Sequence, residues 1–228
     1  MKIITIDGPA GAGKGITAKL LAQRLNYYHL DSGALYRIVS LYLLRKDIRP
    51  NELDKIISKV QEIDIKITQL EDKTSKFYLN GQDVTDDIRT EEVSSKVADY
   101  AKIPEIREFV KKQQVKICQD MNIVAEGRDT GSEIFPNADL KIYLTADFEV
   151  RAERRFKELV SKGKNVDFDK VKEELRQRDY LDLNREISPL RVPEDARILD
   201  NTNLTIDQQV DIIYKWFLEI QSKDNENK

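Results

Sequence analysis

Apolar residues follow two different periods along this chain. Residues 2–7 (KIITID) form a short β-branched run, and the segment TAKLLAQRL that follows carries apolar residues three and four positions apart. This pattern predicts a strand, a loop and a helix. The same criteria predict four more strands at 27–30, 122–126, 140–145 and 196–200, and long helices near 34–46, 104–119, 148–162, 168–186 and 206–222. Because strands that alternate with helices usually lie parallel, we expect an α/β fold whose five-stranded parallel sheet is flanked by helices.

The alternation breaks between about residues 48 and 88. The runs IDIKIT (63–68), KFYL (76–79) and NGQDV (80–84) indicate short strands, and the Asn80-Gly81 pair is a strong hairpin signal. We therefore expect an antiparallel module inserted into the parallel core. The last six residues, KDNENK, are polar and are expected to fray.

Length and composition limit the protein class. The 228 residues, of which 40% are hydrophobic, suit one domain with insertions or two small domains. Met1-Lys2 leads into an apolar strand without a signal-peptide pattern, no apolar run is long enough to cross a membrane, and we expect a cytoplasmic protein. The single cysteine, Cys118, and the single histidine, His29, leave no internal disulfide, no Cys-rich zinc site and little scope for His-based metal binding. Both are expected to be structural.

Charge argues against a nucleic-acid-coating protein, because the net charge is −3 and the isoelectric point is about 5.5. The distribution is more informative than the sum. Eight of the fifteen arginines lie between Arg151 and Arg197. The planar guanidinium group matches pairs of phosphate oxygens, so this enrichment suits a small anionic ligand; the alternative is a helix surface covered with ion pairs.

The segment GPAGAGKG at 8–15 carries the clearest chemistry. Its Gly8, Gly13 and Lys14 have the spacing of the phosphate-binding loop, or P-loop, between a predicted strand and a predicted helix. Unpaired backbone N–H groups at a helix N-terminus attract phosphate oxygens, and the lysine adds a positive charge. The candidate ATP-binding residues are Gly8, Pro9, Ala10, Gly11, Ala12, Gly13, Lys14, Gly15, Ile16 and Thr17.

The hydroxyl that this motif usually carries after the lysine is missing. Gly15 and Ile16 follow Lys14, and Thr17 lies about 200° around a helix from position 15, so simple replacement is not expected. Mg²⁺, carried with ATP, can be held by phosphate oxygens, water and an acidic residue. Glu126 and Asp129 are candidates, and no residue is assigned as a metal ligand.

Three segments together resemble the bacterial cytidylate kinases of the nucleoside monophosphate kinase family. They are GPAGAGKG, DSGALYR at 31–37 and EGRDTGSEIFPNADLKIYL at 126–144. The resemblance covers roughly residues 2–218 and includes LNGQDVTDDIRTEEV at 79–93. It implies transfer of the terminal phosphate of ATP to CMP, and also to dCMP, giving ADP and CDP or dCDP. It also implies a P-loop core (1–37, 89–147 and 187–222), an inserted acceptor-binding module (38–88) and a lid with arginine-rich helices (148–186).

The resemblance also implies site residues. Arg37, Arg128 and Arg185 match arginines that bind the acceptor phosphate, and Ser32 matches a residue near it. Arg107 and Asp129 match residues that read the cytosine base, while Arg178 and Asp182 match residues at the sugar and phosphates. Arg151, Arg154 and Arg155 match the base of a lid over the donor. The residues expected to take part in catalysis are Lys14, Arg128, Asp129 and Arg185.

Three positions depart from the family pattern. Ile16 replaces a threonine, Ala98 a serine near the base, and Leu181 an arginine. Two alternatives therefore stay open at this point, namely a kinase of the same fold for UMP or dTMP, and a nucleotide-binding regulator that is catalytically weak. A monomer that binds ATP and CMP or dCMP, with no nucleic acid and no membrane as partner, is expected.

Overall fold

The computed structural model describes residues 1–226, the last three of them by backbone only, and contains two separate sheets. The larger one is parallel throughout, with the strand order β2-β6-β1-β7-β8. Its strands are β1 (Ile3–Asp7), β2 (Tyr28–Asp31), β6 (Ile123–Gly127), β7 (Leu140–Thr145) and β8 (Arg197–Asp200). The predicted five-stranded parallel sheet is thus confirmed, with each strand within one residue of its expected position.

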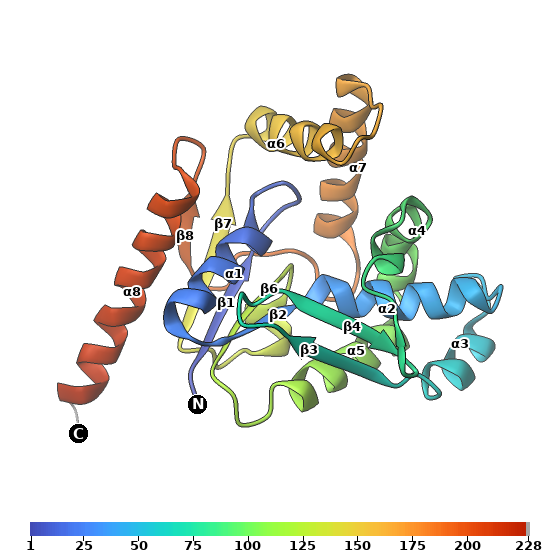
Figure 1. Ribbon diagram of the computed structural model, residues 1–228, viewed down its shortest axis with the longest axis horizontal. Helices are drawn as coiled ribbons and strands as arrows, with labels where there is room; N and C mark the ends of the chain where they lie inside the picture. Colours follow the sequence, from blue (N-terminus) through green and yellow to red (C-terminus); the bar gives the residue numbers. More distant parts are fainter. Residues whose placement is uncertain (227–228) are drawn as a thin grey trace.

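Helices cover both faces of this sheet (Figure 1). In β6, Val124 packs toward α1 (Lys14–Leu25) and α8 (Ile206–Glu226), whereas Ile123 and Ala125 pack toward α2 (Ser32–Arg45) and α5 (Pro104–Ile117). Alternate residues of a strand point to opposite faces, so both faces of β6 are apolar.

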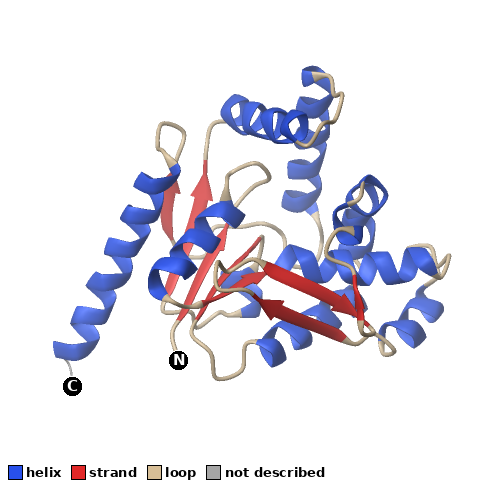
Figure 2. Cartoon of the chain, viewed as in Figure 1, coloured by secondary structure: helices blue, strands red, loops and turns tan. Residues whose placement is uncertain are grey.

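The smaller sheet is the predicted antiparallel insertion. It joins β3 (Ile65–Gln69), β4 (Ser75–Leu79) and β5 (Gln82–Asp83). Asn80 and Gly81 have φ of +49° and +82°, as the predicted two-residue hairpin requires. The helix α3 (Leu53–Val60) was not predicted; it places Ile56 and Val60 in the core beside this sheet. Figure 2 shows the two sheets as separate groups of strands.

The remaining helices surround the loop end of the large sheet. They are α4 (Glu91–Ala101), α6 (Phe148–Ser161) and α7 (Phe168–Asn184), with short helical turns at Asp87–Arg89 and Thr130–Ile134. In Figure 1 the carboxyl ends of β1 and β7 point toward α6 and α7, which pack on each other. The end of α8 differs from expectation, because residues 223–226 of the stretch predicted to fray are helical; the last two residues of that stretch lie outside the described residues.

Candidate active site

The loop between β1 and α1 curls through three glycines with positive φ: +151° at Gly8, +74° at Gly11 and +89° at Gly13. A Cβ atom on Gly8 would lie 2.0 Å from the carbonyl oxygen of Leu144 in β7. Within residues 1–226, the backbone N–H groups of residues 11–15 donate to no acceptor. These N–H groups lie at the open N-terminus of α1, where an anion binds most favourably.

Lys14 is buried beside this loop, and its ammonium group donates to the carbonyl of Pro9 at 2.8 Å. The pKa of Lys14 is lowered to about 7, mainly by burial and also by the positive charge of Arg128, while the carboxyl of Glu126 opposes the shift. A phosphate group would favour the charged form of Lys14 and raise its pKa.

Thr17 stabilises the loop through hydrogen bonds of its side chain. Its buried hydroxyl donates to Gly13 O at 2.8 Å and accepts from Gln209 Nε2 of α8 at 2.8 Å. Asn201, which follows β8, donates from Nδ2 to Ala12 O at 2.9 Å. Thr17 is therefore held by the protein itself, and Ile16, whose side chain is 42% exposed, offers no hydroxyl in its place. The roles of Asn201 and Gln209 were not expected from the sequence, because neither belongs to a recognisable motif.

Two carboxyl groups lie beside the N-terminus of α1. Asp31 and Glu126 are register partners at the ends of β2 and β6, and a Cβ atom on Gly15 would lie 3.6 Å from Glu126 Oε1. Burial, together with the charge of Asp31, raises the pKa of Glu126 to about 7, and Lys14 opposes this shift. No group of three or more His, Cys, Asp or Glu residues suited to a metal occurs in the described part of the chain. One or two carboxylates are nevertheless enough for Mg²⁺ when nucleotide phosphates and water complete its ligands.

Asp7, at the end of β1, holds the GRDTG segment. Its carboxylate accepts hydrogen bonds from Thr130 N (2.9 Å), Thr130 Oγ1 (2.8 Å) and Gly131 N (2.7 Å). Arg128 and Asp129 directly precede these donors, so Asp7 fixes the turn that carries them.

Asp182 on α7 gathers three of the predicted acceptor arginines. Its carboxylate lies 2.8 Å from Arg128 Nε, 3.4 Å from Arg178 Nε and 3.9 Å from Arg185 NH1. Asp182 is 4% exposed, and the side chains of Arg128 and Arg178 keep 21% and 30% of their surface exposed. One carboxylate thus orients several guanidinium groups without neutralising them all.

Arg37 reaches the same region from α2. Its guanidinium donates to Ser94 Oγ at 2.8 Å and to Ile88 O at 3.2 Å. The pKa of Arg37 is lowered to about 10, mainly by burial; Asp31 opposes the shift, and the nearby positive charges of Arg178, Arg89 and Arg155 add to it. An anion bound beside these arginines would favour their charged forms. Ser32 is buried at the start of α2, and a Cβ atom on Gly127 would lie 3.5 Å from its Oγ.

A cavity of about 340 Å³ adjoins these arginines, and Tyr36, Arg107, Asp129 and Ser188 are among the residues that line it. Arg107 is hydrogen-bonded to Asp129, and both are almost fully buried. Arg185 NH2 lies 3.4 Å from the other oxygen of Asp129. Among the described residues, the buried Tyr36 hydroxyl and Arg107 Nε have no hydrogen-bond partner. Because unpaired buried polar groups are costly, these atoms suit a polar ring that enters the cavity.

The three arginines of the expected lid are already engaged. Arg151 donates to Ala146 O, to Ala10 O and to Asp179, and Arg154 donates to both oxygens of Asn201. Arg155 pairs with Glu158 at 2.8 Å on the same helix. Arg151 and Arg154 thus hold the loops at the donor side in place, while Arg155 remains 38% exposed in its side chain.

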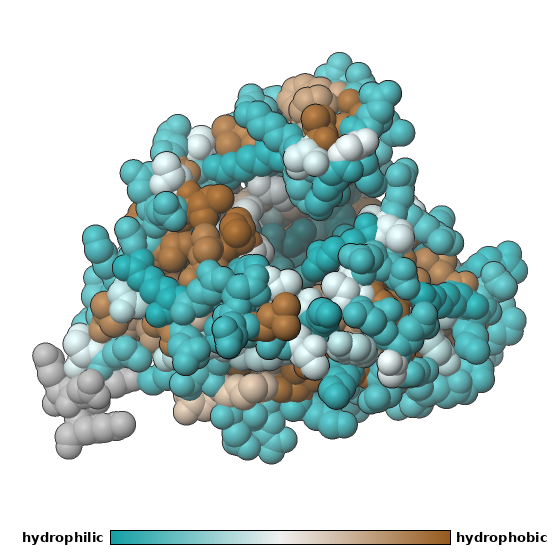
Figure 3. Space-filling view, viewed as in Figure 1, coloured by the Kyte–Doolittle hydropathy of each residue, from teal (hydrophilic) through white to brown (hydrophobic). Residues whose placement is uncertain are grey.

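The remaining departures from the family pattern have defined places. Ala98 lies on α4 one turn after Ser94, which bonds Arg37, and Leu181 is 44% exposed on α7. Figure 3 shows a hollow below the part of the surface formed by α6 and α7.

Cys118 is buried, and burial raises the pKa of its thiol to about 12.

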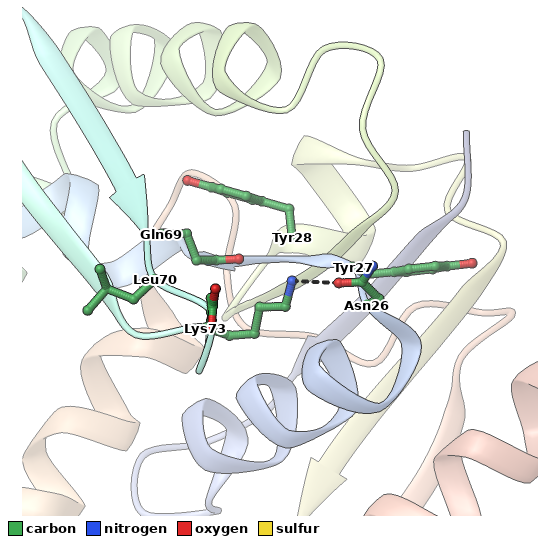
Figure 4. Close-up of a pocket in the computed structure, with 7 residues that line it drawn as sticks. Asn26, Tyr27, Tyr28, Gln69, Leu70 and Lys73 are labelled. Carbon is green, nitrogen blue, oxygen red and sulfur yellow. Dashed lines mark hydrogen bonds between the residues drawn. The ribbon is translucent and has the colours of Figure 1, made fainter.

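A second cavity, of about 430 Å³, lies between the insertion and the corner that joins α1 to β2 (Figure 4). Lys73 donates to Asn26 Oδ1 at 3.1 Å, and the amide of Gln69 bonds both backbone groups of His29. These contacts attach the β3–β4 hairpin to the core. None of the predicted site residues lines this cavity.

No helix in the described residues combines the length and apolar character needed to cross a bilayer.

The family model described as "Cytidylate kinase" matches residues 4–219. A cytidylate kinase of Caldicellulosiruptor bescii is 44% identical over 95% of this chain and 96% of its own length. That of Bacillus licheniformis is 43% identical over 90% of this chain and 91% of its own. An uncharacterised protein from Eubacterium ventriosum has the same fold, with a TM-score of 0.53, 14% identity, and coverage of 95% of this chain and 98% of that one.

Proposed function

This chain belongs to the cytidylate kinase family, and we propose the parts that its residues play in the reaction of that family. The chain is an enzyme that transfers the terminal phosphate of ATP to CMP, giving ADP and CDP. The observation that carries the proposal is that a phosphate loop and a cluster of arginines meet at one edge of the parallel sheet, with the positive charge of Arg128 near enough to lower the pKa of Lys14.

The donor phosphates bind to the N–H groups of residues 11–15, and Lys14 neutralises the charge that moves to the leaving phosphate. Phosphoryl transfer gains most from positioning and from charge stabilisation, since little covalent chemistry is left to the protein. No side chain needs to remove a proton, because the attacking oxygen of CMP is already anionic. The solitary histidine is consistent with this mechanism.

The acceptor phosphate binds among Arg37, Arg128, Arg178 and Arg185, with Ser32 at its edge. Asp182 holds three of these guanidinium groups in position before CMP arrives, so little side-chain entropy is lost on binding. Arg128 stands between the two substrates, which makes it the strongest candidate to stabilise the transferring group.

The cytosine ring enters the cavity lined by Tyr36, Arg107 and Asp129. Asp129 accepts a hydrogen bond from the amino group of cytosine, and Arg107 Nε donates to the ring nitrogen or carbonyl. A site whose buried groups require these partners rejects a base that lacks them. Uracil, which carries a carbonyl in place of the amino group, would face the Asp129 carboxylate.

Mg²⁺ would be held by Glu126 and Asp31 together with the nucleotide phosphates. Asp129, the other candidate, faces two largely buried arginines, Arg107 and Arg185, whereas Asp31 pairs only at 3.3 Å with the exposed Arg89 and accepts a bond from Ala34 N within the described residues. The ion would supply positive charge to the phosphate oxygens. The missing side chain at Gly15 leaves space beside Glu126 for the ion or its water. We also propose dCMP as a second acceptor, a monomeric state and a cytoplasmic location.

The test is coupled detection of ADP with CMP, dCMP, UMP and dTMP as separate acceptors. CMP and dCMP are expected to give the highest kcat/KM. Faster turnover of UMP or dTMP would make the chain a kinase for that acceptor. Tight binding of ATP and CMP without CDP formation would make it a regulator.

A further inference from the structure

Asp179 is a partly buried carboxylate that none of the steps above uses. It lies on α7 directly after Arg178, and its side chain is 14% exposed. Its Oδ1 accepts a hydrogen bond from the backbone N–H of Ala10 at 3.1 Å, and its Oδ2 accepts one from Arg151 NH1 at 2.5 Å. It therefore connects the lid directly to the phosphate loop.

Arg151 completes the connection from the other side. The same NH1 donates to Ala10 O at 2.9 Å, so both backbone groups of Ala10 are bonded to this one ion pair. A Cβ atom on Gly11 would lie 2.9 Å from the carbonyl oxygen of Arg151, so the loop also packs directly against the backbone of α6. In Figure 1 this loop lies beside α7.

The bonds at Ala10 separate it from the rest of the loop. The next five N–H groups, of residues 11–15, have no acceptor in the described part of the chain. A loop rich in glycine has many accessible backbone conformations, and fixing one residue at its start limits those of the residues that follow. The clamp at Ala10 thus keeps the phosphate-binding N–H groups pointing at one place.

The balance of charge between Asp179 and Arg151 explains how the Asp179 carboxylate can lie close to the proposed site of the ATP phosphates. Asp179 alone would repel the phosphates, but its charge is balanced by Arg151, whose side chain is 10% exposed. A part-buried ion pair that also bonds Ala10 N, Ala10 O and Ala146 O holds geometry without adding net charge.

We propose that Asp179, through Ala10 and Arg151, is a positioning residue for the donor nucleotide. Its neighbours Arg178 and Asp182 on the same helix serve the acceptor, so α7 supports both substrates through different residues. This inference rests on the proposed function only in taking the loop as the site of the donor phosphates.

Titration calorimetry with ADP and, separately, with CMP tests the proposal in Asp179→Asn. The variant removes the negative charge and its strong bond to Arg151. A hydrogen bond to a charged group typically contributes about 1.5–3 kcal/mol, so the Kd for ADP should rise about 10-fold or more. The Kd for CMP should stay within about twofold, because the acceptor arginines are not altered.

Glu149→Gln is the matched control, because Glu149 also joins α6 to α7, through Lys172 at 2.7 Å, without touching the loop. It should leave both Kd values unchanged. Unchanged ADP affinity in Asp179→Asn, an equal loss of ADP and CMP affinity, or an equal loss of ADP affinity in Glu149→Gln would each overturn the proposal.

Amide hydrogen exchange of the unaltered protein gives a test that does not depend on how the variant folds. The Ala10 N–H should exchange far more slowly than the N–H groups of Gly11 and Ala12. Equal exchange at these three positions would refute the clamp. A protein that shows the protected Ala10 amide and yet makes no CDP would contradict the proposed function while leaving the clamp intact.

Discussion

In the proposed site, the donor half and the acceptor half would bind phosphate by opposite means. The donor half is built from main chain: residues 8–15 lie consecutively, and three glycines allow the curl. The acceptor half is built from side chains of α2, α5, α7 and the turn after β6, held by buried carboxylates such as Asp182 and Asp129. The donor half should therefore be most sensitive to an added Cβ atom, and the acceptor half to the loss of a single charged group.

The largest effect is expected for Arg128→Ala. The variant removes the guanidinium that we propose to lie between the two substrates, and it leaves Asp182 without its closest partner. Arginines that stabilise transferring phosphoryl groups are worth about 10³-fold or more in rate, so kcat/KM for CMP should fall by about that factor. Steady-state ADP release measures it. Arg176→Ala is the control and should be near normal, because Arg176 is an exposed arginine of α7 that pairs with Glu173 and stacks on the ring of Phe148, away from the acceptor cluster. A loss below about tenfold in Arg128→Ala would contradict the assigned role.

Gly8→Ala tests the donor half. The new Cβ atom would lie 2.0 Å from Leu144 O, and the φ of +151° is unfavourable for alanine. We expect the midpoint of thermal unfolding to fall by several degrees, and kcat/KM for ATP to fall by about 100-fold, because the loop must move.

Gly81→Ala is the control for that variant. Gly81 also has positive φ, but a Cβ atom there would meet nothing within 4 Å. The free energy of unfolding of Gly81→Ala should fall by only about 1 kcal/mol, because alanine is less stable than glycine at positive φ, and its kinetics should be normal. Similar activity losses in the two glycine variants would show that the close packing of the phosphate loop has no special importance.

Asp129→Asn tests base recognition within the acceptor half. The new NH₂ group can donate to the carbonyl of uracil, so the ratio of kcat/KM for CMP to that for UMP should fall by about 10-fold or more. The ratio is measured within one variant, which removes any effect of a smaller folded fraction. An unchanged ratio would exclude Asp129 from base recognition.

The smallest expected effect is an uptake of protons by Lys14 when ADP binds. Burial lowers the pKa of Lys14 to about 7 in the free protein, and bound phosphate should raise it. Binding of ADP without metal should therefore take up protons near pH 8, and few near pH 6, where Lys14 is already charged. Calorimetry in buffers of different ionisation enthalpy measures this uptake. Equal uptake at both pH values would contradict the shift.

The two halves also differ in how far the sequence predicts them. The strands and the loop at Gly8 to Lys14 are predicted because their signals are local: a β-branched run, glycine spacing and a helix that follows. Asn201, Gln209 and Asp179 act on the same loop from about 170 to 190 residues away, and no local pattern marks them. Only the folded chain brings them together.

Within the acceptor half, the spacing of Arg178, Asp182 and Arg185 predicts one helical face, and their resemblance to family residues gives their roles. The structure adds that Asp182 holds the arginines, which helical spacing alone does not require. The helix α3 was missed although Leu53, Ile56, Ile57 and Val60 have helical spacing, because residues 48–88 were interpreted together from the strand and turn signals at 63–84.

The most direct measurement is a crystal structure with CMP and a non-hydrolysable ATP analogue bound together. The account predicts the donor phosphates against the N–H groups of residues 11–15, and the phosphate of CMP within hydrogen-bond distance of Arg37, Arg128 and Arg178. A CMP phosphate bound elsewhere, with these guanidinium groups turned away from it, would contradict the account.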